Sequence, residues 1–264
     1  MTQSTAAGDQ VLDRSRFEGL SPRQQLDFYN ENGFLLIPEA VSAGQMRRID
    51  EEISCRAIPP RWDYWDEWPG PELESLIANP RLLEPLRLCY GDDLRFFKSV
   101  YTEWRDRVAT ALENRRQNLH RDYTPEPTDG DYRNSCASWV NVGHYFVDLD
   151  IDEGPLWVVP GSHRVAWTGQ REFEAYGDQA RMVLARAGDA VMFHCLTMHA
   201  GGAMVSGRPR PSLFQSYRVG WAAPLGAVPE WPEEIVHRSP PDLRKLLEGL
   251  NDGTRFGAHG MIRV

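Results

Sequence analysis

The sequence lacks the features that mark several broad classes of protein. Its four cysteines are scattered and form no C-x-x-C pair, which argues against a disulfide framework and a cysteine zinc site: Cys55, Cys89, Cys136 and Cys195. No apolar run reaches the length of a membrane span. The formal net charge is −9, so there is no basic excess of the kind that nucleic-acid-binding proteins show. We therefore expect reduced cysteines, and neither a nucleic acid nor a membrane as a partner.

The start of the chain also lacks the basic and apolar regions of a secretion signal, so we expect a cytoplasmic protein. The sequence shows no internal repeat and no low-complexity segment. Its 264 residues, 41% hydrophobic and 25% charged, are typical of a soluble globular protein with one large core. We expect a flexible polar arm over residues 1–20 and a single domain over residues 21–264.

The first third of the domain has the patterns of helices. Ser21 and Pro22 predict a helix start, and Gly33 predicts its end. A short buried strand follows and is stopped by Pro38, and Ser42 begins a second amphipathic helix.

The stretch RWDYWDEWPGPE at residues 61–72 is aromatic, acidic and broken by Pro and Gly. It predicts a loop, which is either a lid over the substrate or a packed surface segment. Residues 73–91 then have helical spacing that ends at Gly91.

From residue 94 onward the pattern changes to short β-rich runs separated by turn residues, at 94–104, 138–149, 156–160, 180–185, 189–194 and 212–221. Several short strands of this kind favour a sandwich or barrel. A last helix is expected within residues 240–250. The predicted fold is therefore mainly β, a jelly-roll double sheet with helices from the N-terminal third packed on one face.

Residues 117–124, QNLHRDYT, contain His120 and Asp122, two positions apart. On or beside a strand, both side chains would enter the same cavity. Two histidines and one carboxylate on one face of a metal are the ligand set of non-haem iron(II) oxygenases. Seven histidines in so acidic a chain give about one such triplet by chance. The triplet alone therefore does not identify a metal site, and the case for one depends on the surrounding sequence.

A third ligand has three candidates in the β region, His163, His194 and His199. His194 and His199 are five apart, so on one regular strand they would face opposite sides, and at most one would join the pair. Arg210 follows a Gly-rich stretch that is typical of a hairpin, which would place it beside His199. A guanidinium there suits a dicarboxylate co-substrate, and Arg208 is the competing candidate.

Four motifs in order carry a family resemblance: NENGFLLIPEAVS, LHRDY, GPLWVVPGSH and AGDAVMFHCLTMHAGG followed by RPR. Together they resemble the phytanoyl-CoA dioxygenase family of Fe(II)/2-oxoglutarate oxygenases over roughly residues 24–220. The resemblance implies a double-stranded β-helix, or jelly-roll, core. It implies that His120, Asp122 and His199 bind iron and that Arg210 binds the distal carboxylate of 2-oxoglutarate.

The resemblance also implies roles for three further positions. Trp139 matches a tryptophan that flanks the co-substrate, and Lys98 is a candidate cationic neighbour of it. Gly201 stands where the family often has a hydroxyl residue, so one expected co-substrate hydrogen bond is either missing or supplied by another group. Related halogenases carry Gly or Ala at the acidic ligand position. Because Asp122 is present, the reaction expected is hydroxylation, or another outcome of hydrogen abstraction such as desaturation or cyclisation, instead of halogenation.

The function predicted is hydroxylation of an aliphatic C–H of a small molecule, in specialised or amino-acid metabolism. Dioxygen and 2-oxoglutarate are consumed, and succinate and carbon dioxide are released. Tyr101, Trp104 and Tyr123 are candidates to line an apolar pocket. Two alternatives are a non-catalytic jelly-roll binding protein and a cupin-type metal enzyme that uses no 2-oxoglutarate. The presence of all ligands disfavours the first, and Arg210 disfavours the second.

Overall fold

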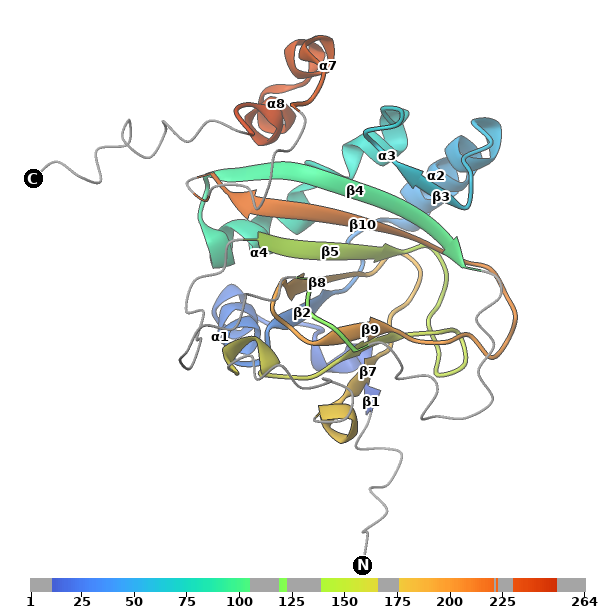
Figure 1. Ribbon diagram of the computed structural model, residues 1–264, viewed down its shortest axis with the longest axis vertical. Coiled ribbons are helices and arrows are strands. Elements are labelled where there is room, and N and C mark those ends of the chain that lie inside the picture. Colours follow the sequence, from blue (N-terminus) through green and yellow to red (C-terminus); the bar gives the residue numbers. More distant parts are fainter. Residues whose placement is uncertain are drawn as a thin grey trace, which may run out of the picture.

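The computed structural model describes residues 11–104, 119–122, 139–165, 176–220, 222 and 230–250, and it shows two facing β-sheets (Figure 1). The larger sheet has six strands, all paired antiparallel, in the order β2 (Phe34–Ile37), β8 (Ala190–His194), β5 (Trp139–Tyr145), β10 (Arg210–Val219), β4 (Leu94–Trp104) and β3 (Arg61–Asp63). The smaller has four, in the order β1 (Val11–Leu12), β7 (Arg181–Val183), β6 (Leu156–Val158) and β9 (His199–Gly201).

The long strands of the six-stranded sheet have two different faces. Along β10, Leu213, Gln215 and Tyr217 are buried on the outer face, where the Tyr217 hydroxyl donates to the carbonyl of Ile77 at 2.9 Å. The alternate residues Phe214 and Ser216 point to the inner face and line a cavity. The larger sheet is therefore a wall between a helical layer and the cavity.

The helical layer comes from both ends of the chain. It contains α1 (Pro22–Asn32), α2 (Ala43–Cys55), α3 (Pro71–Ser75), α4 (Pro80–Tyr90), α7 (Glu233–Arg238) and α8 (Pro241–Leu247). Figure 1 shows α2, α3, α7 and α8 beyond the six-stranded sheet, on the side away from the smaller sheet. Buried leucines of α4 and α8 join one hydrophobic cluster with the sheet's outer face. Helix α7 was not predicted from the sequence.

The caps of α1 formed as predicted. Ser21 accepts from the N–H of Gln24, and the Gln24 side chain accepts from the N–H of Ser21, so the two form a capping box. Gly33 ends the helix with φ at 79°, a left-handed conformation that favours glycine. A Cβ there would also lie 2.4 Å from Nδ1 of His163, so no other residue fits.

Two expectations about the N-terminal third are wrong. Residues 61–72 are not one loop, because they hold strand β3 and the start of α3. Trp62 is buried, and Trp65 stacks on Trp231 at 3.5 Å. These aromatics pack on the outer face of the sheet, away from the cavity, so the segment is no lid. The reason is that edge strand β3 pairs with β4, which turns the following aromatics toward the helical layer.

The polar arm does not extend to residue 20. Residues 11–12 form β1, and Phe17 is buried between Phe28 and Phe34, with ring centroids 5.2 and 6.3 Å away. Arg14 pairs with the buried carboxylate of Asp189 at 3.1 Å. One aromatic ring and one ion pair thus fix a segment that is otherwise polar. Residues 1–10 lie outside the described part of the chain.

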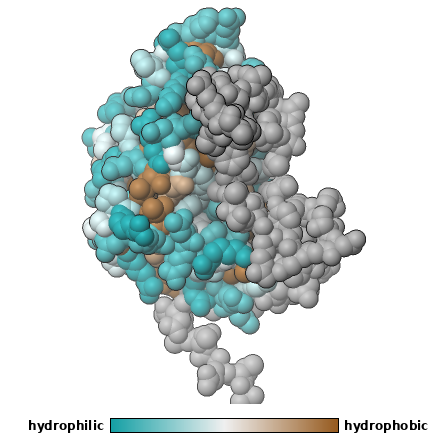
Figure 2. All heavy atoms as spheres, turned by 90° about the vertical axis from the view of Figure 1, so that its left-hand side faces the viewer, coloured by the Kyte–Doolittle hydropathy of each residue, from teal (hydrophilic) through white to brown (hydrophobic). Residues whose placement is uncertain are grey.

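The surface and the cysteines agree with the composition. Figure 2 shows that hydrophilic residues cover most of the described surface on that side of the molecule, with a small hydrophobic area between them. Three cysteines, Cys55, Cys89 and Cys195, are free, and Cys136 lies outside the described residues. Among the helices that the structure describes, none has the length and hydrophobicity needed to cross a membrane.

Candidate metal centre and co-substrate pocket

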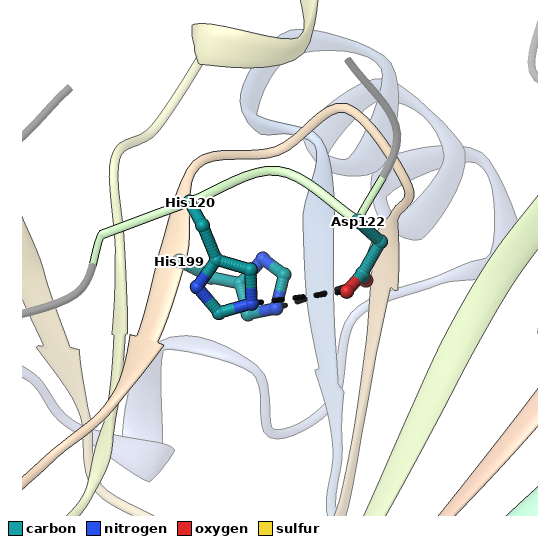
Figure 3. A group of neighbouring side chains, drawn as sticks. All are labelled: His120, Asp122 and His199. Carbon is teal, nitrogen blue, oxygen red and sulfur yellow. Dashed lines mark ion pairs between the residues drawn. The ribbon is translucent and has the colours of Figure 1, made fainter. Parts of the chain in front are cut away.

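The structure brings His120, Asp122 and His199 together (Figure 3). Nε2 of His120 lies 3.8 Å from one oxygen of Asp122, and Nε2 of His199 lies 3.7 Å from the other. One donor atom from each residue can be chosen so that all three lie within 4.8 Å of one another. In the described part of the chain this is the one group of three or more such side chains that could hold a metal ion.

Main-chain hydrogen bonds hold the three residues in place. His120 and His199 form an antiparallel bridge, in which each N–H donates to the other's carbonyl, at 3.0 and 2.9 Å. The N–H of Asp122 donates to the carbonyl of Cys195 at 3.1 Å. The prediction that the triplet lies beside a strand is therefore confirmed, because residues 119–122 run along the start of β9.

The donor set fits a divalent transition metal. Nδ1 of His199 lies 2.9 Å from the carbonyl of Thr197, so this nitrogen carries the proton and Nε2 offers its lone pair toward Asp122. Burial lowers the pKa of His199 below its ordinary value, an effect that the charge of Asp122 opposes. The ring is therefore neutral near pH 7, as a metal ligand must be. Two imidazoles and one carboxylate match the iron(II) ligand set and leave coordination positions for other groups.

Asn141, on β5, positions the carboxylate of Asp122. Its Nδ2 donates to Oδ2 of Asp122, while its Oδ1 accepts from the hydroxyl of Ser216 at 2.6 Å and from Nε1 of Trp139 at 3.2 Å. Because two donors occupy Oδ1, the amide can only present its N–H to Asp122. Asn141 was not among the residues predicted from the sequence. A polar residue inside an otherwise apolar strand, WVNVG, was the available signal.

A cavity of about 360 Å³ lies between the two sheets and contains the three residues. Apolar side chains from both sheets form much of its wall, and polar groups lie at two places along it. The lining residues used below are Lys98, Val100, Thr102, Tyr145, Leu156, Phe193, Arg210 and Phe214. Its volume is at the small end of the range for ligand pockets.

Arg210 enters this cavity and is 5% exposed. Its Nη1 donates to the carbonyl of Gly154, and its Nη2 lies 3.4 Å from where a Cβ on Gly201 would stand. Gly201 is two residues beyond His199, so the guanidinium lies one step along β9 from the candidate metal ligand. The missing side chain at Gly201 gives the guanidinium its space, and Thr102 and Tyr145 supply hydroxyl groups to the same end of the cavity.

The route that brings Arg210 here differs from the expected one. Strands β9 and β10 belong to different sheets and are not hydrogen-bonded neighbours, so the predicted hairpin is wrong. Arg210 instead reaches across the cavity from the facing sheet. The competing candidate, Arg208, is 79% exposed and pairs with Glu153 at 3.5 Å on the surface.

The two other candidate histidines, His163 and His194, lie outside the group. His194 ends β8, a turn follows, and His199 begins β9, so the two were not on one strand. His194 packs against His163, with ring centroids 5.3 Å apart, and His163 lies 3.2 Å from the carbonyl of Asn30. Burial lowers the pKa of His194 to about 3 and that of His163 to about 4, so both are neutral structural groups.

Among the predicted aromatics, Trp104 lines the cavity, whereas Tyr101 is buried on the outer face beside Phe146. Tyr123 lies outside the described residues. Trp139 contacts Asn141 and does not lie on the cavity wall described above, so its predicted place beside the co-substrate stays a prediction.

The model of the phytanoyl-CoA dioxygenase (PhyH) family matches residues 29–212, more than half of the chain. The chain belongs to the phytanoyl-CoA dioxygenase family. It is thus an iron- and 2-oxoglutarate-dependent dioxygenase by class, and the family predicted from the four motifs is confirmed.

Curated relatives of this PhyH-family chain include ectoine dioxygenases from Bordetella bronchiseptica and Bordetella parapertussis. Each is 22% identical over 249 residues, covering 78% of this chain and 78% of the relative. Among solved structures, the carbocyclase SnoK of nogalamycin biosynthesis has 23% identity and a TM-score of 0.60 over 88% of this chain and 95% of its own.

A second solved structure is HygX from Streptomyces hygroscopicus with nickel and 2-oxoglutarate bound. It has 18% identity and a TM-score of 0.60, over 76% of this chain and 87% of its own. At these identities the likeness concerns the fold, and it confirms the predicted jelly-roll class.

Proposed function

We propose that this protein hydroxylates an aliphatic C–H of a small molecule, with His120, Asp122 and His199 as the iron ligands. Arg210 binds the distal carboxylate of 2-oxoglutarate. The observation that supports this most is the joint placement of a two-histidine, one-carboxylate group and a buried arginine on one cavity.

The residues of the cavity have three roles in the proposed reaction: they bind the metal, orient its ligands and exclude water. Bound iron would supply the activation of dioxygen, coupled to the oxidative decarboxylation of 2-oxoglutarate to succinate and carbon dioxide. Asp122 is oriented for metal binding by Asn141, and His199 by the carbonyl of Thr197. Leu156, Phe193 and Phe214 give the cavity an apolar wall that excludes water from the reacting groups.

The volume of the cavity and the names of similar proteins support a small-molecule substrate. A cavity of about 360 Å³ that must also hold 2-oxoglutarate suits a small second molecule. Two of the similar proteins are named as an ectoine dioxygenase and as a carbocyclase of nogalamycin biosynthesis. Both support a role in amino-acid or specialised metabolism. Asp122 fills the position that a halogenase leaves open, which favours hydroxylation.

The test is an anaerobic titration of the apoprotein with Fe(II) and then 2-oxoglutarate, followed by the visible charge-transfer band of the chelate. The wild type should give the band, and His199→Ala should abolish it. Arg210→Ala should need about 10–100-fold more 2-oxoglutarate, because a charge-assisted bidentate contact is lost.

The matched control is Arg208→Ala, which removes an exposed arginine two positions away and should leave the titration unchanged. A folded wild type that binds metal but never gives the band would refute the proposal. That result would favour a metal enzyme without 2-oxoglutarate, and a failure to bind metal would favour a non-catalytic binding protein.

A further inference from the structure

Lys98 brings a second positive charge into the same cavity as Arg210. It lies on the inner face of β4 and lines the cavity with His120 and Asp122. Its side chain is exposed, and none of the ion pairs among the described residues includes it. The whole sequence has only two lysines, Lys98 and Lys245, among 29 basic residues.

The register of the sheet places Lys98 in the same cross-strand row as Asn141, the residue that contacts Asp122. Lys98 pairs across β4 and β10 with Ser216, and Ser216 pairs across β10 and β5 with Asn141. Asn141 in turn contacts Asp122. Lys98 is therefore two cross-strand neighbours away from the residue that orients the Asp122 carboxylate.

Arg210 lies at the other end of the same cavity. It precedes Ser216 by six residues on β10, which is about 20 Å along a strand. A dicarboxylate bound between the three metal ligands and Arg210 extends along the cavity toward Thr102 and Tyr145. It leads away from the row of Lys98, whose side chain is exposed.

The charges at the proposed iron and co-substrate sites sum to zero without Lys98. Iron(II) and Arg210 supply three positive charges, and Asp122 and 2-oxoglutarate supply three negative ones. Asp63, on β3, is a nearby carboxyl: burial raises its pKa, and Lys98 is among the charges that oppose this rise. No ion pair joins the two. The charge of Lys98 is thus available to a second ligand in the cavity.

We propose that Lys98 binds a carboxylate of the primary substrate, so that the enzyme acts on small carboxylic acids. This inference rests on the proposed function, because it assigns Arg210 and the metal to 2-oxoglutarate. A charge-assisted contact of this kind changes affinity by about ten-fold or more. It gives Lys98 a role in choosing the substrate, in place of the contact with the co-substrate that the sequence suggested.

The test uses the full chain loaded with Zn(II) and N-oxalylglycine, which holds the co-substrate site without turnover. Its lysines are reductively ¹³C-methylated, which keeps their charge. Two lysine side-chain signals are expected and are assigned with Lys98→Met and Lys245→Met. The probes are matched acids and amides: proline and prolinamide, cyclohexanecarboxylate and its amide, and benzoate and benzamide.

The expected result is that at least one acid shifts the Lys98 signal, leaves the Lys245 signal in place and binds ten-fold or more tightly than its amide. Lys98→Met should lose this preference, Lys98→Arg should retain it, and the exposed-site control Lys245→Met should behave as wild type. N-Oxalylglycine should bind Lys98→Met within about two-fold of the wild type.

Three results would overturn the inference. The acids and amides could bind equally, no acid could bind at all, or Lys98→Met could lose its affinity for N-oxalylglycine. The last result would make Lys98 a co-substrate residue. A wild type that binds neither the metal nor N-oxalylglycine is a different outcome, because it refutes the proposed function itself.

Discussion

Replacing Asn141 with alanine tests whether the candidate metal site depends on the residue that orients Asp122. Asn141 is 7% exposed and stands at the centre of three hydrogen bonds: it donates to Asp122 and accepts from Ser216 and Trp139. The variant removes the donor that holds the Asp122 carboxylate in one orientation. The carboxylate must then be ordered by the metal alone, which costs binding free energy.

The size of the effect follows from the kind of contact. Loss of a partner that orients a metal ligand typically lowers metal affinity 10–100-fold, which is about 1.4–2.8 kcal/mol. The same change leaves the buried Ser216 hydroxyl and the Trp139 N–H without their acceptor. The unsatisfied hydroxyl of buried Ser216 costs about 1–3 kcal/mol of folding stability, so the variant is also less stable.

The assay is Fe(II) affinity measured anaerobically, together with urea unfolding of the apoprotein. Ser216→Ala is the control, because it keeps Asn141 and its bond to Asp122 while removing one of the two donors to Oδ1. Its iron affinity should fall less than that of Asn141→Ala. If Asn141→Ala folds and binds iron as tightly as the wild type, the reasoning about Asp122 is refuted.

Three further predictions concern the cavity and the core. Gly201→Ala should change the 2-oxoglutarate concentration needed for half-saturation by less than about three-fold, because the added Cβ would only touch Arg210 at 3.4 Å. Gly201→Val should raise that concentration at least ten-fold, because the larger side chain would displace the guanidinium. Titration of the charge-transfer band measures both variants. Asp189→Ala should lower the free energy of unfolding in urea by about 3 kcal/mol, because the buried carboxylate pairs with Arg14 and accepts from two backbone N–H groups. The control Asp27→Ala removes an exposed carboxylate and should change stability by less than about 0.5 kcal/mol. Equal losses in the two variants would contradict the role of Asp189. Burial lowers the pKa of His144 to about 4, so its neutral form stabilises the fold fully above about pH 6.5, and this contribution is lost as the pH falls toward 4. Between these two pH values, His144→Gln should reduce the slope of unfolding free energy against pH by up to about 1.4 kcal/mol per pH unit. An unchanged slope would show that His144 does not titrate in this way.

Local patterns predicted the parts of the fold that depend on local chemistry. The capping box at Ser21 and the end of the first helix at Gly33 are set by a few neighbouring atoms, and both formed as expected. The long strands β4 and β10 were visible as uninterrupted β-rich runs. Strand β9 was not, because its residues His199, Ala200 and Gly201 lack the β-branched and large aromatic side chains that mark a strand in a sequence.

The candidate site was predictable in its members but not in its assembly. The His-x-Asp triplet and His199 were found from spacing and family motifs, and they do lie together. Arg210 was found for a wrong reason, because it reaches the cavity from the facing sheet and not from a neighbouring strand. Asn141 was missed because its importance comes from a contact with Asp122, 19 residues away, that only the packing of the two sheets creates.

The three candidate metal ligands are anchored to different sheets, and this has a consequence for how the protein would lose its metal. His120 and His199 are bridged along the smaller sheet, whereas Asp122 is tied through Asn141 to the larger one. Parting of the two sheets would therefore break the hydrogen bond from Asn141 to Asp122, while the main-chain bridge between His120 and His199 stays intact. We expect iron affinity to fall at that stage, because the Asp122 carboxylate loses the group that orients it. Loss of bound metal would then be an early sign that the two sheets have separated.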